Sequence, residues 1–264
     1  MSTLIIPDVH GETFWEKPVL EAVEDSKVKQ IIFLGDYFDS YYPERISRQD
    51  EIFNFIKILE VKKMYPDKIK LLMGNHDMAY MCCTGCSRQA WGDQFEYIRN
   101  LILDNAKYMD VTAYNYKRDV LVSHAGVTSV WLEVFAKKFF RENTGAAMDA
   151  IKWGFLNYML HQAALFPESK FMDRFATLMS MVSFLRCGPD IAGSPMWADM
   201  REWGQEGEHA IPNLTQIVGH SKNYHIVDIV GQDRLLVKCV DLVDCQPYYI
   251  EDDEDFKRKE TKLS

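Results

Sequence analysis

The protein has 264 residues, of which 47% are hydrophobic and 26% charged, as is typical of a globular chain with a sizeable buried core. This composition excludes a disordered protein, and because no apolar run reaches about 18 residues we expect no membrane-spanning helix. The 39 acidic residues outnumber the 30 basic ones and give a net charge of −9, so the sequence carries no strong signal for binding DNA or RNA.

The N-terminal sequence has neither a basic segment nor a long apolar one, so we expect no secretory signal. Without such a signal, the six cysteines predict reduced thiols in a cytoplasmic protein. Cys83 and Cys86 supply a CxxC pair. No second pair at zinc-finger spacing accompanies it, which disfavours a structural zinc there.

Five short β-branched runs, each followed by a polar turn that contains glycine, predict buried strands. They lie at residues 4–7, 31–35, 69–74, 120–123 and 216–219. Stretches with helical character lie between the first four runs, at 14–26, 50–64 and 89–107. Because strands and helices alternate in this part of the chain, we expect an α/β fold.

The segment 129–185 has few strand signals and many Met, Phe, Ala, Leu and Lys residues. We expect it to be a helical insertion or cap in which Pro167 separates two helices. Further strands are expected at 225–230, 235–241 and 247–250. The sequence thus predicts a single domain over residues 1–250 and a charged, solvated tail over 251–264.

Each of the five buried strands is followed by Asp, His or Asn beside a glycine. In chain order the motifs are Asp8-Val9-His10-Gly11, Gly35-Asp36-Tyr37-Phe38-Asp39, Gly74-Asn75-His76-Asp77, Ser123-His124-Ala125-Gly126 and Gly219-His220-Ser221. In open α/β sheets ligands bind at the carboxyl ends of the strands, so we expect these side chains to converge. Oxygen and imidazole donors without thiolate suit manganese, iron or zinc. Six candidate ligands exceed the need of one tetrahedral ion, which indicates two ions, and Asp36 is the best candidate to bridge them.

Each motif alone has a plainer explanation. Asp and Asn commonly form turns after strands, and a lone His near a strand end is more often a hydrogen-bonded core residue than a ligand. Five such motifs on successive strands are hard to produce by turn chemistry alone, which favours a metal site.

Together the motifs resemble those of the calcineurin-like metallophosphoesterases, and in particular the phosphoprotein phosphatase branch with its bacterial and phage serine/threonine phosphatases. The resemblance extends from residue 3 to about residue 221 and leaves the helical segment 129–185 unexplained. It implies a central β-sandwich flanked by helices. It also implies two divalent metal ions, with manganese as the first choice and iron or zinc as alternatives.

The resemblance implies a role for each matched residue. It implies Asp8 and His10 as ligands of the first ion, Asn75, His124 and His220 as ligands of the second, and Asp36 as the bridge. His76 would protonate the leaving group, and Asp39 would orient His76. The nucleophile would be a water or hydroxide shared by the two ions.

The chain departs from the family in its phosphate-binding arginines. Many phosphoprotein phosphatases have an arginine where this chain has Ser40, and Arg45 or Arg48 could fold back to replace it. The segment 186–199 resembles the later arginine segment of the family. It implies Arg186 as a phosphate contact beside Asn75, and Arg201 more weakly. Either arginine could instead be a surface ion-pair residue.

Other residues around the motifs allow two interpretations. Lys222 stands where other branches of the superfamily have a second histidine, which leaves the first metal site more open. Tyr37, Phe38, Tyr41 and Tyr42 could form a wall for an aromatic leaving group, although ordinary packing is the favoured explanation.

The predicted function is a two-metal phosphoric ester hydrolase that acts on phosphomonoesters, in the manner of a serine/threonine protein phosphatase. The expected partner is a phosphorylated substrate, either a phosphoprotein or a nucleotide. We expect no interaction with a membrane. A dinucleoside polyphosphate hydrolase or a nucleotide or RNA-end phosphatase is the alternative. A non-catalytic binding scaffold is the second alternative, disfavoured because all six ligands, His76 and Asp39 are present.

Overall fold

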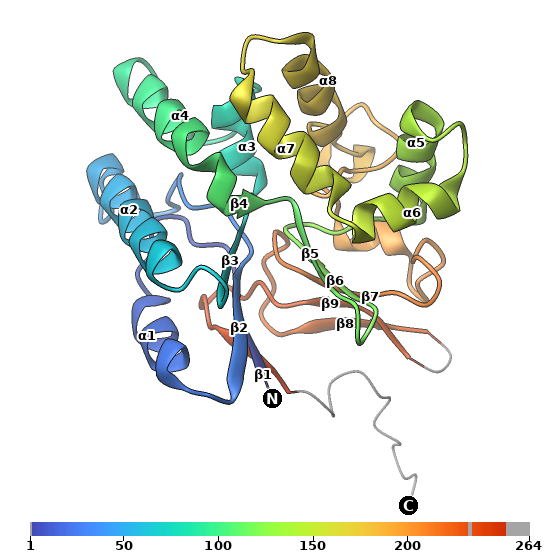
Figure 1. The fold of residues 1–264 in the computed structure, drawn as a ribbon, viewed down its shortest axis with the longest axis horizontal. Coiled ribbons are helices and arrows are strands. Elements are labelled where there is room, and N and C mark those ends of the chain that lie inside the picture. The colour runs from blue at the N-terminus through green and yellow to red at the C-terminus, as the bar shows by residue number, and fades with distance from the viewer. Residues whose placement is uncertain (1, 232–233, 252–264) are drawn as a thin grey trace, which may run out of the picture.

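The structure, a computed structural model, describes residues 2–231 and 234–251 (Figure 1). The strands run over β1 Ser2–Ile6, β2 Val28–Phe33, β3 Ile69–Leu72, β4 Met109–Asp110, β5 Thr112–Asn115, β6 Val120–Ser123, β7 Thr215–Val218, β8 Val227–Val230, β9 Leu235–Cys239 and β10 Tyr248–Glu251. Within the described residues they form two five-stranded sheets, with the orders β10-β1-β2-β3-β4 and β5-β6-β7-β9-β8.

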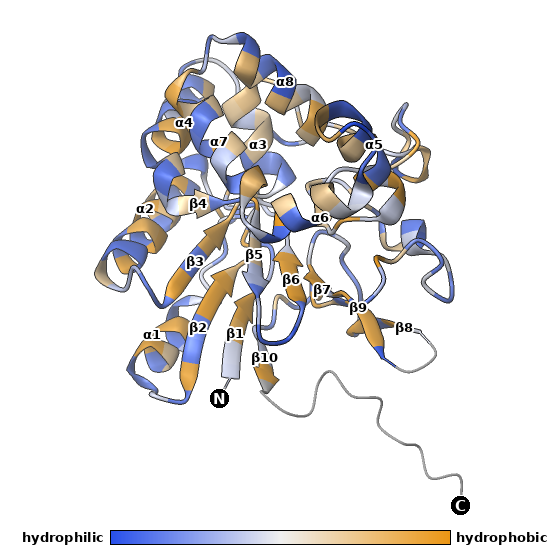
Figure 2. Cartoon of the chain, turned by 45° about the vertical axis from the view of Figure 1, so that its right-hand side comes forward, coloured by the Kyte–Doolittle hydropathy of each residue, from blue (hydrophilic) through white to orange (hydrophobic). Residues whose placement is uncertain are grey.

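The two sheets pack face to face because apolar side chains alternate along their strands. Leu4 and Ile6 of β1 belong to the large core that includes the helices, whereas Ile5 belongs to a separate cluster. That cluster also contains Ile32 of β2 and Ile217 of β7, so it lies between the sheets. In Figure 2, β2 and β3 are mostly hydrophobic along their length. The predicted α/β fold with a central β-sandwich is confirmed.

The α-helices run over α1 Glu16–Glu24, α2 Arg48–Met64, α3 Asn75–Cys82, α4 Asp93–Asn105, α5 Ser129–Phe139, α6 Thr144–Lys152, α7 Phe155–Leu165 and α8 Lys170–Met179. Helices α1 and α2 lie beside the first sheet, near β2 and β3 (Figure 1). Helix α2 begins two residues before its predicted start, because the side chain and backbone of Ser47 exchange hydrogen bonds with those of Asp50 in a capping box.

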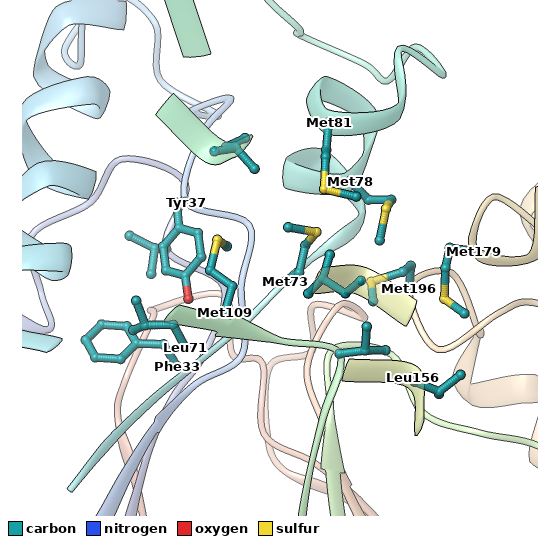
Figure 3. Packing of buried hydrophobic residues seen from close by; sticks show 14 of the residues in the cluster. Phe33, Tyr37, Leu71, Met73, Met78, Met81, Met109, Leu156, Met179 and Met196 are labelled. Atoms are coloured by element: carbon teal, nitrogen blue, oxygen red, sulfur yellow. The ribbon is translucent and has the colours of Figure 1, made fainter. Parts of the chain in front are cut away.

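The segment 129–185 contains α5 to α8, and Pro167 lies between α7 and α8. Methionines fill much of the core between this segment and α3. Figure 3 shows Met78 and Met81 of α3 in the same buried cluster as Met179, at the end of α8, and Met196. The unbranched thioether side chain adapts to irregular gaps, which suits a contact between helices and loops of different direction.

The five strands that precede the motifs are present as β1, β2, β3, β6 and β7. The first three are parallel to one another, and β6 is parallel to β7. The sequence did not predict α3, β4 or β5. Helix α3 opens with the turn-forming residues Asn75, His76 and Asp77, β4 has only two residues, and β5 has the sequence Thr-Ala-Tyr-Asn, which is no β-branched apolar run.

Two further expectations concern the C-terminal tail and membrane-spanning helices. The charged tail predicted at 251–264 lies outside the described residues, apart from the backbone of Glu251, which ends β10. Among the helices of the described residues, none is both long enough and apolar enough to cross a membrane.

Candidate metal centre

The side chains that follow the strands converge on Asp36, which lies after β2 and is 2% exposed. Asp36 Oδ2 lies 3.6 Å from His10 Nε2 and 3.6 Å from His124 Nε2. Asp36 Oδ1 accepts a hydrogen bond from the backbone N–H of His76 at 2.9 Å. The motifs after β1, β2, β3 and β6 therefore meet at one carboxylate.

The motif after β7 joins the cluster through His220. His220 Nδ1 lies 3.1 Å from His124 Nε2, and the His220 backbone N–H donates to Asp8 Oδ1 at 3.2 Å. His124 Nε2 also lies 2.9 Å from Asn75 Oδ1. The structure thus brings all six sequence-predicted ligands together.

Backbone carbonyls fix the proton on two of the imidazole rings. His10 Nδ1 lies 2.9 Å from Phe38 O, and His124 Nδ1 lies 2.9 Å from Leu34 O. Because a carbonyl oxygen only accepts, each Nδ1 carries a proton, and in the neutral ring Nε2 is then the nitrogen that can bind a metal. Burial lowers the pKa of His10 to about 4, so this ring is neutral at neutral pH.

Oxygen atoms lie close to the Nε2 atoms of His10 and His124. His124 Nε2 meets the amide oxygen of Asn75, and both His10 Nε2 and His124 Nε2 face the carboxylate of Asp36. His220 Nε2 is buried and has no hydrogen-bond partner among the described residues. Imidazole, carboxylate and amide groups that converge in this way are the donor set that suits a borderline divalent metal. The residues therefore fit the metal ions that the resemblance implies.

Two sets of ligand atoms lie within 4.8 Å of one another. One set comprises Asp8, Asp36, His124 and His220, and the other comprises His10, Asp36 and His76. Asp36 belongs to both sets, as a bridging carboxylate should. The division differs from the expected one in that Asp8 groups with the second-ion ligands and His76 groups with His10.

Asp39 lies in hydrogen-bond contact with His76, the residue that the resemblance implies it would orient. His76 Nδ1 lies 2.7 Å from Asp39 Oδ2, while Asp39 Oδ1 accepts hydrogen bonds from Tyr80 at 2.7 Å and Arg48 at 2.5 Å. Burial opposes protonation of His76, but the negative charge of Asp36 and the bond to Asp39 outweigh burial and raise the pKa of His76 well above its usual value. An imidazole that keeps its proton can act as a general acid.

Asp77 ties two motif loops together through their backbone. Its carboxylate accepts hydrogen bonds from the N–H groups of Asp36, Tyr37 and Gly74, all at 2.8–2.9 Å. The loops approach so closely that a Cβ added to Gly74 would lie 2.1 Å from Asp36 Oδ1, and one added to Gly35 would lie 2.3 Å from Gly74 N. Glycine at these two positions is therefore required by the close approach.

Four residues of the centre adopt a left-handed backbone conformation. The φ angles are +44° at His10, +53° at Asp36, +66° at Asp39 and +64° at His220. Residues with a Cβ rarely adopt this region, and the surrounding hydrogen bonds must hold them there. The backbone of the centre is thus specified more tightly than an ordinary turn.

The predicted phosphate-binding arginines lie in different surroundings. Arg186 lies beside the centre, where its Nη2 donates to Ser221 Oγ at 2.6 Å and its Nε lies 3.2 Å from Asp199 Oδ2. The side chain of Arg201 is 65% exposed and pairs with the same Asp199 at 2.7 Å. The structure brings Arg186, but not Arg201, next to the motif of His220. A phosphate contact by either arginine stays a prediction.

The arginines considered as replacements for the one absent at Ser40 also differ. Arg45 has a 76% exposed side chain that lies 3.8 Å from Glu44. Arg48 does fold back, but its Nη1 is bonded to Asp39 and to Glu51 Oε2 at 2.6 Å. Arg48 therefore supports Asp39, and its Nη1 is committed to the two carboxylates.

The aromatic residues of the second motif divide into two pairs. Tyr37 and Phe38 are fully buried in the core, as ordinary packing predicts, and Figure 3 shows Tyr37 among its neighbours. Tyr41 and Tyr42 are about half exposed. The ring of Tyr41 lies against the centre, with its centroid 4.7 Å from that of His10.

Lys222 faces a buried carboxylate. Its Nζ lies 3.5 Å from Oδ1 of Asp241, which follows β9 and is fully buried. Burial by itself would lower the pKa of Lys222, but the charges of Asp241 and Asp8 raise it. Lys222 thus stays charged beside the motif of His220.

Sequence reasoning gave no role to several residues that shape the centre. Asp77 could have been found from its position in the first turn of α3, where an acidic side chain caps a helix. Glu51 accepts hydrogen bonds from the backbone N–H groups of Asp39 and Ser40, and no local pattern marks it. Cys86 Sγ lies 3.5 Å from His76 Nε2, so the cysteine-rich loop borders the centre.

The chain is similar to one protein family and to individual known proteins. The family described as calcineurin-like phosphoesterase matches residues 1–158. A probable serine/threonine-protein phosphatase of Encephalitozoon cuniculi (strain GB-M1) is 37% identical over 76 residues, which make up 29% of this chain and only 15% of that protein. A solved serine/threonine phosphatase of Saccharomyces cerevisiae, described as similar to human phosphatase PP5, aligns with 91% of this chain and 67% of that chain at 17% identity and a TM-score of 0.43.

The family match covers more than half of the chain and contains four of the five motifs, those of Asp8, Asp36, Asn75 and His124. The chain therefore belongs to the calcineurin-like phosphoesterase family, which confirms the resemblance found in its sequence.

Proposed function

We propose that the protein is a two-metal hydrolase of phosphomonoesters that acts on phosphoserine or phosphothreonine in proteins. The observation that carries this proposal is the convergence of His124 Nε2 with the oxygens of Asp36 and Asn75, next to a His76 whose pKa the charge of Asp36 and the hydrogen bond to Asp39 raise. The name of the Encephalitozoon cuniculi relative supports the protein substrate. We assign the activity to the cytoplasm, where the six free cysteines would stay reduced.

Asp8, His10 and Asp36 would hold one ion, and Asp36, Asn75, His124 and His220 the other. Manganese is the first choice, with iron or zinc as alternatives, because the same ligands accept all three. When bound, the two ions supply Lewis acidity that stabilises negative charge on the phosphoryl group and makes a water molecule more acidic.

The protein's own residues would supply the proton for the leaving group. His76 Nε2 donates it to the departing alkoxide oxygen, while the Nδ1 proton stays on the hydrogen bond to Asp39. Arg48 and Tyr80 bind the other oxygen of Asp39, so the carboxylate cannot rotate away from the imidazole. Arg186 and the amide of Asn75 would contact the phosphoryl oxygens.

The test is hydrolysis of para-nitrophenyl phosphate by purified protein in the presence of Mn²⁺. We expect turnover that a chelator abolishes and that Mn²⁺ restores. A fully metallated protein that shows no turnover above the blank would instead favour the non-catalytic scaffold.

A substrate panel then separates the enzymatic alternatives. Phosphopeptides, mononucleotides, RNA with a terminal phosphate and diadenosine tetraphosphate are compared by kcat/KM. A preference for phosphopeptides is expected. A preference for diadenosine tetraphosphate or for nucleotides would replace the protein phosphatase assignment with the corresponding alternative.

A further inference from the structure

We propose that Arg88 contacts the phosphoryl group of the substrate and replaces the arginine that is absent at Ser40. This inference rests on the proposed phosphatase function. Arg88 belongs to the loop between α3 and α4, far in sequence from the position where the family carries its arginine.

The guanidinium of Arg88 is held in place from two directions. Its Nε donates to the backbone carbonyl of Asp39 at 3.0 Å, and its Cζ lies 3.9 Å from the ring centroid of Tyr41. A guanidinium that stacks on an aromatic ring and uses Nε as an anchor is restricted in rotation. The side chain is thus preorganised, and no carboxylate of the described residues pairs with it.

The backbone of Arg88 is fixed by the same network. Its φ is +61°, in the left-handed region, and its carbonyl accepts a hydrogen bond from Arg48 Nη2 at 2.8 Å. Arg48 also binds Asp39, the residue that orients His76. The loop that carries Arg88 is therefore tied directly to the support of the general acid.

The terminal nitrogens of Arg88 remain open. Within residues 2–231 and 234–251, its Nη1 and Nη2 make no hydrogen bond and no ion pair. Two parallel N–H donors on a fixed guanidinium match two oxygens of a phosphate group. By contrast, the Nη1 of Arg48 donates hydrogen bonds to Asp39 and Glu51.

Arg88 also lies within reach of the metal ligands. Its Cζ is 3.9 Å from the Tyr41 centroid, which is 4.7 Å from the His10 centroid, so the guanidinium carbon is less than 9 Å from the imidazole. Arg186 approaches from the other end of the centre, through Ser221 next to His220. A phosphoryl group over Asp36 would then meet one arginine on each side.

The experiment compares Arg88→Ala with Arg45→Ala, a matched arginine on the neighbouring loop with an exposed side chain. Two quantities are measured on Mn²⁺-loaded protein: the Ki of inorganic phosphate and kcat/KM for para-nitrophenyl phosphate. For Arg88→Ala we expect the Ki to rise and kcat/KM to fall by about tenfold to a hundredfold, the scale of a lost charged hydrogen bond. Arg45→Ala should match the wild type.

Tyr41→Leu is a second variant that leaves Arg88 in place but removes its stacking partner. It should weaken phosphate binding less than Arg88→Ala does, with unchanged metal content. Equal Ki values for phosphate in the wild type and in Arg88→Ala would overturn the inference. Loss of metal from Arg88→Ala would also overturn it, since Arg88 would then act through the structure of the centre.

A separate measurement distinguishes failure of the proposed function from failure of the inference about Arg88. Calorimetric titration of inorganic phosphate into the Mn²⁺-loaded protein does not depend on turnover. A wild type that binds phosphate but hydrolyses no phosphomonoester would contradict the proposed function, while the difference in phosphate affinity between Arg88→Ala and Arg45→Ala would still decide the role of Arg88.

Discussion

Cys86 Sγ lies 3.5 Å from His76 Nε2, the nitrogen from which the proposed general acid would donate its proton. The thiol also contacts the amide Nδ2 of Asn75 at 3.5 Å. A group attached to this sulfur would therefore occupy the space of the leaving group.

We expect alkylation of Cys86 with iodoacetamide to abolish phosphatase activity. The loss of activity should be proportional to the fraction of Cys86 that is alkylated, which peptide mass spectrometry measures. Cys86→Ala should stay active and become resistant to the reagent, whereas Cys83→Ala should still be inactivated. Cys82 should not react at pH 8, because burial raises the pKa of its thiol to about 12 and leaves almost no thiolate at that pH. Inactivation of Cys86→Ala at the wild-type rate would show that another site is responsible.

His76→Asn should retain both metal ions yet lower kcat by about a hundredfold or more, the usual scale for a lost general acid. The variant keeps a polar side chain at a buried position and removes the proton donor. Metal content by mass spectrometry is the control. A fall in metal content would identify His76 as a ligand, in line with its proximity to His10 and Asp36.

Asp36→Asn should lose both metal ions together, because Asp36 is common to the two sets of ligand atoms. The amide is nearly isosteric but carries no charge, so the fold should persist. Metal stoichiometry and circular dichroism check the two statements. A variant that retains one ion at full occupancy would show that Asp36 does not bridge.

Gly74→Ala should destabilise the protein by about 1–3 kcal/mol or more, because its Cβ would lie 2.1 Å from Asp36 Oδ1 and 2.5 Å from Asp36 N. Urea unfolding measures the change. Gly145→Ala is the matched control: Gly145 lies in α6 and its added Cβ meets nothing closer than 3.4 Å. There alanine should stabilise the helix by about 0.5–1 kcal/mol. Similar unfolding curves for the two variants would contradict the close approach of the loops.

The sequence allowed most of the centre to be predicted because each motif is local. A strand, a turn and one or two ligands occur within a few residues, as in the segment around Asp8 and His10, and parallel strands bring such segments to one edge. The helix α3 could not be predicted in the same way, since its first residues also form turns.

The residues that support the ligands could not be predicted, because their partners lie far away in sequence. Arg48 is nine residues from Asp39 in the sequence but forty residues from Arg88, to whose carbonyl it donates. Cys86 and His76 come into contact only because the chain reverses direction after α3. Arg186 was found through a family segment rather than through any pairing visible in the chain, and its neighbour Ser221 lies 35 residues on.

Asp77 binds the loops after β2 and β3 through their backbone N–H groups and not through their side chains. The hydrogen bond from Tyr37 to Asp77 therefore depends on the backbone of Tyr37 and not on its side chain, which packs in the core. A one-residue insertion or deletion between β2 and Asp36 would carry the amides of Asp36 and Tyr37 out of reach of Asp77, so these hydrogen bonds require a fixed loop length at this point.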